Sequence, residues 1–94
     1  MKQLILKVVN EVGLHARPAT LFVRAANRYQ STIRLRNITS ESRWADAKSI
    51  LGVLTLGVEK NHEIELQIEG SDEDQAASSL SELILTDYAG SKQD

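Results

Sequence analysis

The stretch Glu63-Ile64-Glu65-Leu66-Gln67-Ile68-Glu69 places an apolar side chain at every second position and a charged or amide side chain between them. Successive side chains of a strand point to opposite faces of a sheet, so this alternation predicts a strand with one buried face and one wet face. An antiparallel sheet can leave one face in water while helices cover the other. The segment therefore predicts a two-layer, open-faced α+β sandwich.

Three further strands are expected. Leu4 to Val9 is short and rich in aliphatic and β-branched residues, Thr32 to Asn37 alternates with Ile33 and Leu35 on one face, and a short strand spans Arg43 to Asp46. The connection between the last two has no Asn-Gly or Asp-Gly pair, which predicts a wide hairpin loop.

Three helices complete the pattern. A helix is expected from about Ala16 to Tyr29, because Pro18 suits a first turn and apolar residues follow at spacings of three and four. Ser49 and Gly57 bracket a short helix over Ile50 to Leu54. A last helix has Ser71 and Asp74 as a capping pair and a buried stripe of Ala76, Leu80, Leu83 and Ile84. The predicted order is β-α-β-β-α-β-α.

Length and composition limit the classes of function. A chain of 94 residues accommodates one domain, expected over residues 1–88 with a loose tail over 89–94, and its small core disfavours a deep cavity. The net charge of −2 disfavours nucleic acid as a partner. Cysteine is absent, which excludes disulfides, thiolate zinc sites and cysteine nucleophiles. Lys7 interrupts the apolar start, which lacks a signal-peptide pattern, so a cytoplasmic protein with no membrane segment is expected.

His15 is the candidate reactive residue. It follows a glycine and directly precedes a helix start, where unpaired backbone N–H groups and the helix dipole favour anions. Arg17 adds a cation that can hydrogen-bond phosphate oxygens, and neutral imidazole has a nucleophilic nitrogen. The pattern suits a histidine that accepts and passes on a phosphoryl group.

Three blocks of the sequence resemble the histidine-containing phosphocarrier protein (HPr) family of the bacterial sugar phosphotransferase system. The block from Gly13 to Ala19, GLHARPA, is similar to the family's phosphorylation motif. The block from Ala47 to Gly57 resembles its regulatory-serine segment, and Glu69 to Glu73 resembles its junction into the last helix. The resemblance implies a four-stranded antiparallel sheet covered on one face by three helices, the same order as the residues predict.

The resemblance also implies roles. His15 corresponds to the histidine that enzyme I phosphorylates on its δ1 nitrogen, and Arg17 to the arginine beside it. The phosphate then passes to sugar-specific enzyme II A-type acceptors, so the protein is a carrier and a substrate of other enzymes, expected to be a monomer without metal or cofactor. Ser49 resembles a serine that a kinase phosphorylates in many relatives. The positions where the family docks its partners are Ala16, Thr20, Ile50 and Leu51.

Several residues have a simpler interpretation. Ser49 at a helix start is explained equally well by capping. His62 has no second histidine at ligand spacing and is interpreted as solvated surface. Trp44, the only tryptophan, lies in a hairpin longer than the family pattern and is expected to pack across strands. Asn61 replaces a family glycine but tolerates a left-handed backbone.

Other functions remain to be weighed. The same element order occurs in RNA-binding and acylphosphate-hydrolysing folds, but the alternating strand exposes glutamates where an RNA-binding sheet needs aromatics. A regulatory relative acting on a transcription factor or enzyme through Ser49, with a serine kinase or phosphatase as partner, is the main alternative. A nitrogen-related phosphotransfer branch is another.

Overall fold

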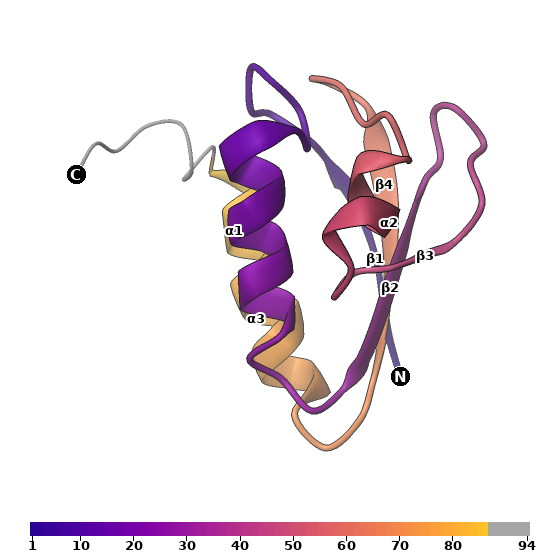
Figure 1. Cartoon of the computed structure of the whole chain (residues 1–94). Coiled ribbons are helices and arrows are strands. Elements are labelled where there is room, and N and C mark those ends of the chain that lie inside the picture. The colour runs from indigo at the N-terminus through magenta and orange to yellow at the C-terminus, as the bar shows by residue number, and fades with distance from the viewer. Residues whose placement is uncertain (87–94) are drawn as a thin grey trace.

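The computed structural model describes residues 1–86, so the tail expected over 89–94 lies outside the described residues. Four strands and three helices follow one another in the predicted order (Figure 1). In chain order these are β1 (Lys2–Lys7), α1 (Ala16–Ala26), β2 (Thr32–Asn37), β3 (Ala45–Asp46), α2 (Ile50–Leu54), β4 (Glu63–Glu69) and α3 (Glu73–Leu85). The α1 and α3 helices lie side by side and α2 lies next to α1, all on one face of the sheet (Figure 1).

The sheet is antiparallel throughout, with strand order β1-β4-β2-β3. The alternating segment β4 is central, and its Leu66 pairs with Leu4 of β1 and Leu35 of β2. Because these residues share one face, the helices cover a continuous apolar layer. The predicted α+β sandwich, a four-stranded sheet with three helices on one face, is confirmed.

The core lies between the sheet and the helices. From β4 it takes Ile64, Leu66 and Ile68, all fully buried, and each such side chain contributes roughly 1.5–3 kcal/mol by leaving water. Phe22 of α1 and Leu80 of α3 pack onto them from the helical layer. The charged and amide side chains of β4 occupy the open face, as the alternation predicts.

The predicted bounds of the first strand and the first helix were wrong. The first strand begins at Lys2 and ends at Lys7, because it pairs residue by residue with β4, whose own bounds set its length. The α1 helix ends at Ala26 instead of Tyr29. Asn27 caps it, donating from Nδ2 to the carbonyl of Val23 at 2.9 Å. The next two backbone N–H groups bond to carbonyls three residues back instead of four, so the α-helical pattern ends there.

The hairpin between β2 and β3 is wide, as expected, and β3 is shorter than predicted, with only Ala45 and Asp46 in the ladder. Trp44 lies over the open face of the sheet instead of extending β3. The guanidinium groups of Arg34 and Arg36 lie 4.6 and 5.0 Å from its ring centroid. Trp44 therefore packs across strands through cation–π contacts.

The predicted cap of α3 was wrong. Ser71 and Asp74 form no capping pair; Asp72 occupies the N-cap position without a cap hydrogen bond. Its carboxylate instead accepts the Ser31 hydroxyl and backbone N–H groups of Gln30 and Ser31, which ties the start of α3 to the start of β2. These hydrogen bonds, the Ser31 hydroxyl first, hold the pKa of Asp72 below its ordinary value.

Candidate functional site

A tight turn sets the position of the first helix. The Asn10 side chain accepts the N–H of Val12 at 3.0 Å, and Gly13 donates to the Asn10 carbonyl at 2.9 Å. Gly13 has φ of +68°, and a Cβ there would lie 2.1 Å from the carbonyl oxygen of Val58. Leu14 donates to that same oxygen at 3.0 Å and is buried. Only glycine fits where these two loops touch.

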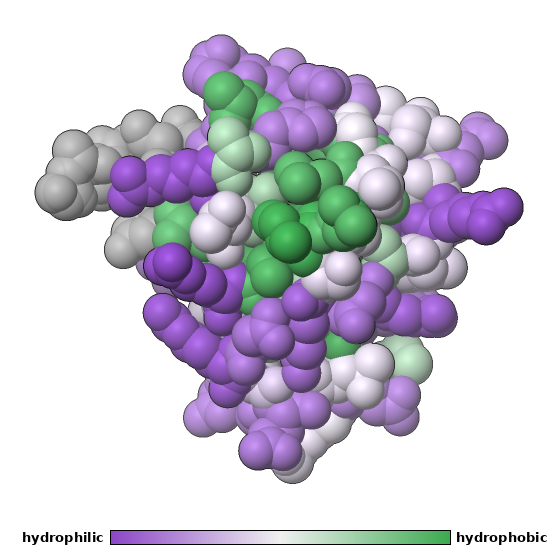
Figure 2. Space-filling view, viewed as in Figure 1, coloured by the Kyte–Doolittle hydropathy of each residue, from purple (hydrophilic) through white to green (hydrophobic). Residues whose placement is uncertain are grey.

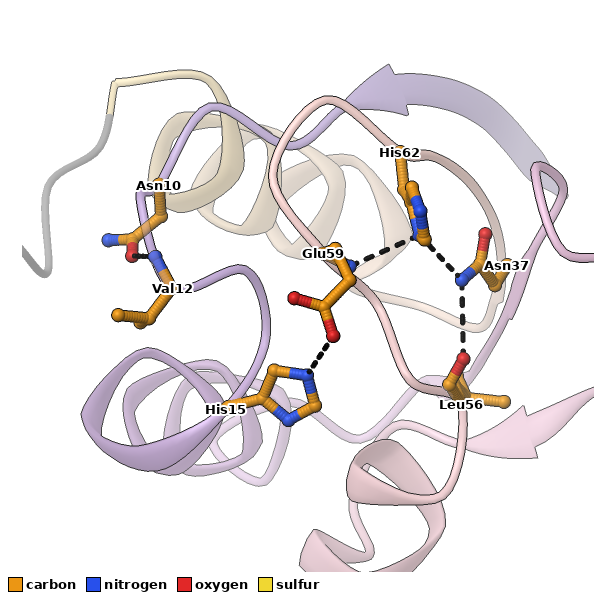
Figure 3. Close-up of polar contacts among 7 residues, drawn as sticks. All are labelled: Asn10, Val12, His15, Asn37, Leu56, Glu59 and His62. Carbon is orange, nitrogen blue, oxygen red and sulfur yellow. Dashed lines mark hydrogen bonds and ion pairs between the residues drawn. The ribbon is translucent and has the colours of Figure 1, made fainter.

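His15 follows at the N-cap of α1, in extended backbone. Its side chain is 35% exposed, and its Nε2 lies 3.2 Å from Oε2 of Glu59 (Figure 3). The ring makes no capping hydrogen bond. One cause is local, since capping bonds go to the second or third N–H of a helix and the third residue here is Pro18.

The first turn of α1 is open to solvent beside His15. Ala16 has φ of +53°, an uncommon conformation for a residue with a Cβ, and is exposed. Arg17 is exposed and makes no hydrogen bond or ion pair with any residue from 1 to 86. His15 and Arg17 thus stand two positions apart at the start of α1, where a helix N-terminus favours anions.

Sequence reasoning missed Glu59 and misplaced His62. The prediction that His62 is solvated surface was wrong: its Nδ1 lies 3.1 Å from the Glu59 backbone nitrogen and 3.1 Å from Nδ2 of Asn37 (Figure 3). Asn37 is fully buried and also donates to the carbonyl of Leu56 at 3.2 Å. Its place on the core face of β2 was a signal in the sequence, because a buried amide needs partners. Glu59 gave no signal, since it lies 44 positions from His15.

The short helix α2 carries the predicted apolar surface. Val53 is buried, whereas Ile50, Leu51 and Leu54 are 41%, 70% and 37% exposed, and these three form what we call the α2 apolar face. Figure 2 shows this apolar surface over α2, continuing towards α1. On α1, Thr20 is exposed and donates to the Ala16 carbonyl at 3.2 Å.

Ser49 is the N-cap of α2, as predicted. Its hydroxyl oxygen accepts the N–H of Gly52 at 3.1 Å, and the residue is half-buried. Asn61 has φ of +74°, which confirms the predicted left-handed turn.

Two further observations concern the described chain. Among residues 1–86, no group of three or more metal-ligating side chains is placed to hold an ion. Within the same range, every helix is too short or too polar to cross a membrane.

The fold and this corner define a class of open-faced α+β domain that exposes a histidine at its first helix. The chain matches the model of the HPr component phosphorylation site of the phosphotransferase system over residues 2–86. It belongs to the HPr family.

Individual relatives agree with this placement. HPr-C-His from Thermoanaerobacter tengcongensis is 36% identical with a TM-score of 0.89, covering 99% of this chain and 100% of the relative. Bacillus subtilis Crh, a catabolite repression protein solved as a domain-swapped dimer, is 37% identical with a TM-score of 0.68, covering 89% of this chain and 93% of Crh. The Multiphosphoryl transfer protein of Vibrio cholerae is 36% identical over 74 residues, which are 79% of this chain and 18% of that protein. The chain therefore spans less than a fifth of that relative.

Proposed function

We propose that this protein carries a phosphoryl group on His15, receives it from enzyme I and passes it to sugar-specific enzyme II A-type acceptors. The observation that carries the proposal is the state of the His15 ring. Its Nε2 is engaged by Glu59, and its Nδ1 makes no hydrogen bond within residues 1–86. A half-exposed imidazole with one unengaged nitrogen suits in-line attack on phosphorus.

The chemistry needs a cation for the phosphoryl oxygens. Arg17 is exposed and unpaired among residues 1–86, so its guanidinium is available to bind them without breaking an existing ion pair. His15 and Arg17 need no metal or cofactor for this role. The protein is then a carrier acted on by other enzymes in the cytoplasm.

Docking of partners is assigned to Ala16, Thr20, Ile50 and Leu51. The exposure of Ile50 and Leu51 supports this assignment, because an apolar group left in water near a reactive residue is typical of an interaction surface. Complexes that must form and separate quickly suit such a small surface, and a monomer leaves it open.

Phosphoryl transfer is tested by intact mass after incubation with phosphoenolpyruvate and enzyme I, followed by brief acid treatment. We expect one acid-labile phosphate, none on His15→Ala, and slower labelling of folded Arg17→Ala. Unchanged labelling of His15→Ala would contradict the proposal.

A regulatory role is the second candidate, favoured by the likeness to Crh. A kinase acting on Ser49 would place about −1.5 to −2 charges at the start of α2. The helix N-terminus tolerates that charge, but an acidic partner docking on the adjoining α2 apolar face is repelled. A serine kinase or phosphatase and a transcriptional regulator are the partners of this role, and a nitrogen-branch system would use the same His15 chemistry.

A further inference from the structure

We propose that Glu59 is a positioning residue for His15: its carboxylate accepts the Nε2–H, selects the tautomer with a free Nδ1 lone pair, and stabilises the ring during phosphoryl transfer. This inference rests on the proposed function and names a residue in the loop between α2 and β4 that acts through the histidine.

The contact itself has a defined direction. An ionised carboxylate has only acceptor oxygens, so the 3.2 Å contact between Oε2 of Glu59 and Nε2 of His15 requires the imidazole to donate. Neutral imidazole carries one ring proton, and fixing it on Nε2 leaves the Nδ1 lone pair available. Carboxylates orient histidines at metal sites in the same way.

The loop that carries Glu59 is held on both sides. The backbone N–H of Glu59 donates to Nδ1 of His62 at 3.1 Å, and the same ring nitrogen accepts a second hydrogen bond from Nδ2 of the buried Asn37. The preceding residue, Val58, is fully buried and accepts the N–H of Leu14. These bonds fix the backbone of the Glu59 loop against the turn that precedes His15 (Figure 3).

The neighbouring cation has a carboxylate partner outside the His15 contact. Lys60 Nζ lies 2.7 Å from Oε2 of Glu11. The Glu59 side chain is 63% exposed and the His15 side chain 35% exposed, so water weakens their attraction and the expected effect is moderate.

The carboxylate also acts during transfer. The Nδ1 lone pair forms a bond to phosphorus as the bond from phosphorus to the donor atom breaks, and that electron pair stays with the donor. The proton remains on Nε2, so the ring, now substituted at both nitrogens, gains a positive charge. Glu59 faces that N–H, and an opposite charge there stabilises the phosphorylated ring more than the neutral one.

The test compares Glu59→Ala, Glu59→Gln and Glu69→Ala. Glu69 is an exposed residue at the end of β4 whose side chain makes no contact with the site, so it matches the charge change. The ¹⁵N resonances of the neutral His15 ring report the tautomer without any phosphoryl transfer. We expect the Nε2–H form to dominate in the parent protein, in Glu69→Ala and, through the amide oxygen, largely in Glu59→Gln.

In Glu59→Ala we expect a mixture of tautomers and a rate of phosphoryl transfer at saturating enzyme I about three- to tenfold lower, the range for one half-exposed charged hydrogen bond. Glu59→Gln keeps the tautomer but loses the charge. Its rate of phosphoryl transfer should therefore fall, while its ¹⁵N resonances stay close to those of the parent protein. An unchanged tautomer in Glu59→Ala, or an equal loss of rate in Glu69→Ala, overturns the proposal. Failure of His15 to be labelled at all would instead overturn the carrier function, and the resonances would still decide the role of Glu59.

Discussion

Replacing Gly13 by alanine tests whether contact between two loops, and not backbone conformation alone, builds the His15 corner. Gly57 offers a matched control. The two glycines have φ of +68° and +60°, but a Cβ at Gly13 meets the Val58 carbonyl oxygen at 2.1 Å, whereas a Cβ at Gly57 meets nothing within 4 Å. The two substitutions therefore share the backbone strain and differ in the steric clash.

The magnitudes follow from that difference. Left-handed backbone costs an alanine about 1–2 kcal/mol, and the reduced freedom of the unfolded chain returns about 0.4–1 kcal/mol at both positions. The clash adds about 1–3 kcal/mol at position 13 only, because the atom in the way is backbone and cannot rotate aside. One kcal/mol lowers Tm by about 4–8 °C in a domain of this size.

Thermal and urea unfolding of the two variants measure the effect. We expect Gly13→Ala to unfold with a free energy about 1–3 kcal/mol lower than Gly57→Ala. We also expect Gly13→Ala to slow phosphoryl transfer at temperatures where it is still folded, because the shift of Val58 moves Glu59 away from His15. Equal stability of the two variants would refute the reasoning that the close approach of the loops requires glycine.

Two further predictions concern helix starts. Ser49→Ala removes the acceptor of the Gly52 N–H and should lower the free energy of unfolding by about 1 kcal/mol. Ser49→Asp should keep the cap and the stability but slow phosphoryl transfer from enzyme I several-fold. Unaltered transfer kinetics of Ser49→Asp would contradict the regulatory proposal. Because hydrogen bonds from Ser31 and Gln30 lower the folded-state pKa of Asp72, that carboxylate stabilises the fold above its ordinary pKa of about 3.9, and the contribution is lost as pH falls through the lower folded value. The parent protein should therefore have a higher Tm than Asp72→Asn near neutral pH, and this difference in Tm should disappear below about pH 4. A difference in Tm that does not depend on pH would count against this interpretation.

Local patterns were sufficient for the architecture. The alternation over Glu63 to Glu69 and over Thr32 to Asn37 gave both strands at their observed bounds, because side-chain parity alone decides which face of a sheet is buried. The short helix after Ser49 also has its predicted bounds, since the capping hydroxyl and its N–H donor lie three residues apart. Prediction failed where an end depended on strand pairing, as at β1, on a capping side chain, as at α1, or on distant partners, as at the start of α3.

The candidate site divides in the same way. The sequence by itself determined that His15 and Arg17 stand at the first turn of a helix after a glycine, and that α2 must expose part of its apolar face, because both follow from neighbours along the chain. Only the tertiary structure decided which ring nitrogen of His15 is engaged and that Glu59, held by His62, engages it. These contacts join loops far apart in sequence, and folding brings them together through the pairing of β1 with β4 and the backbone hydrogen bond from Leu14 to Val58, which no local pattern encodes.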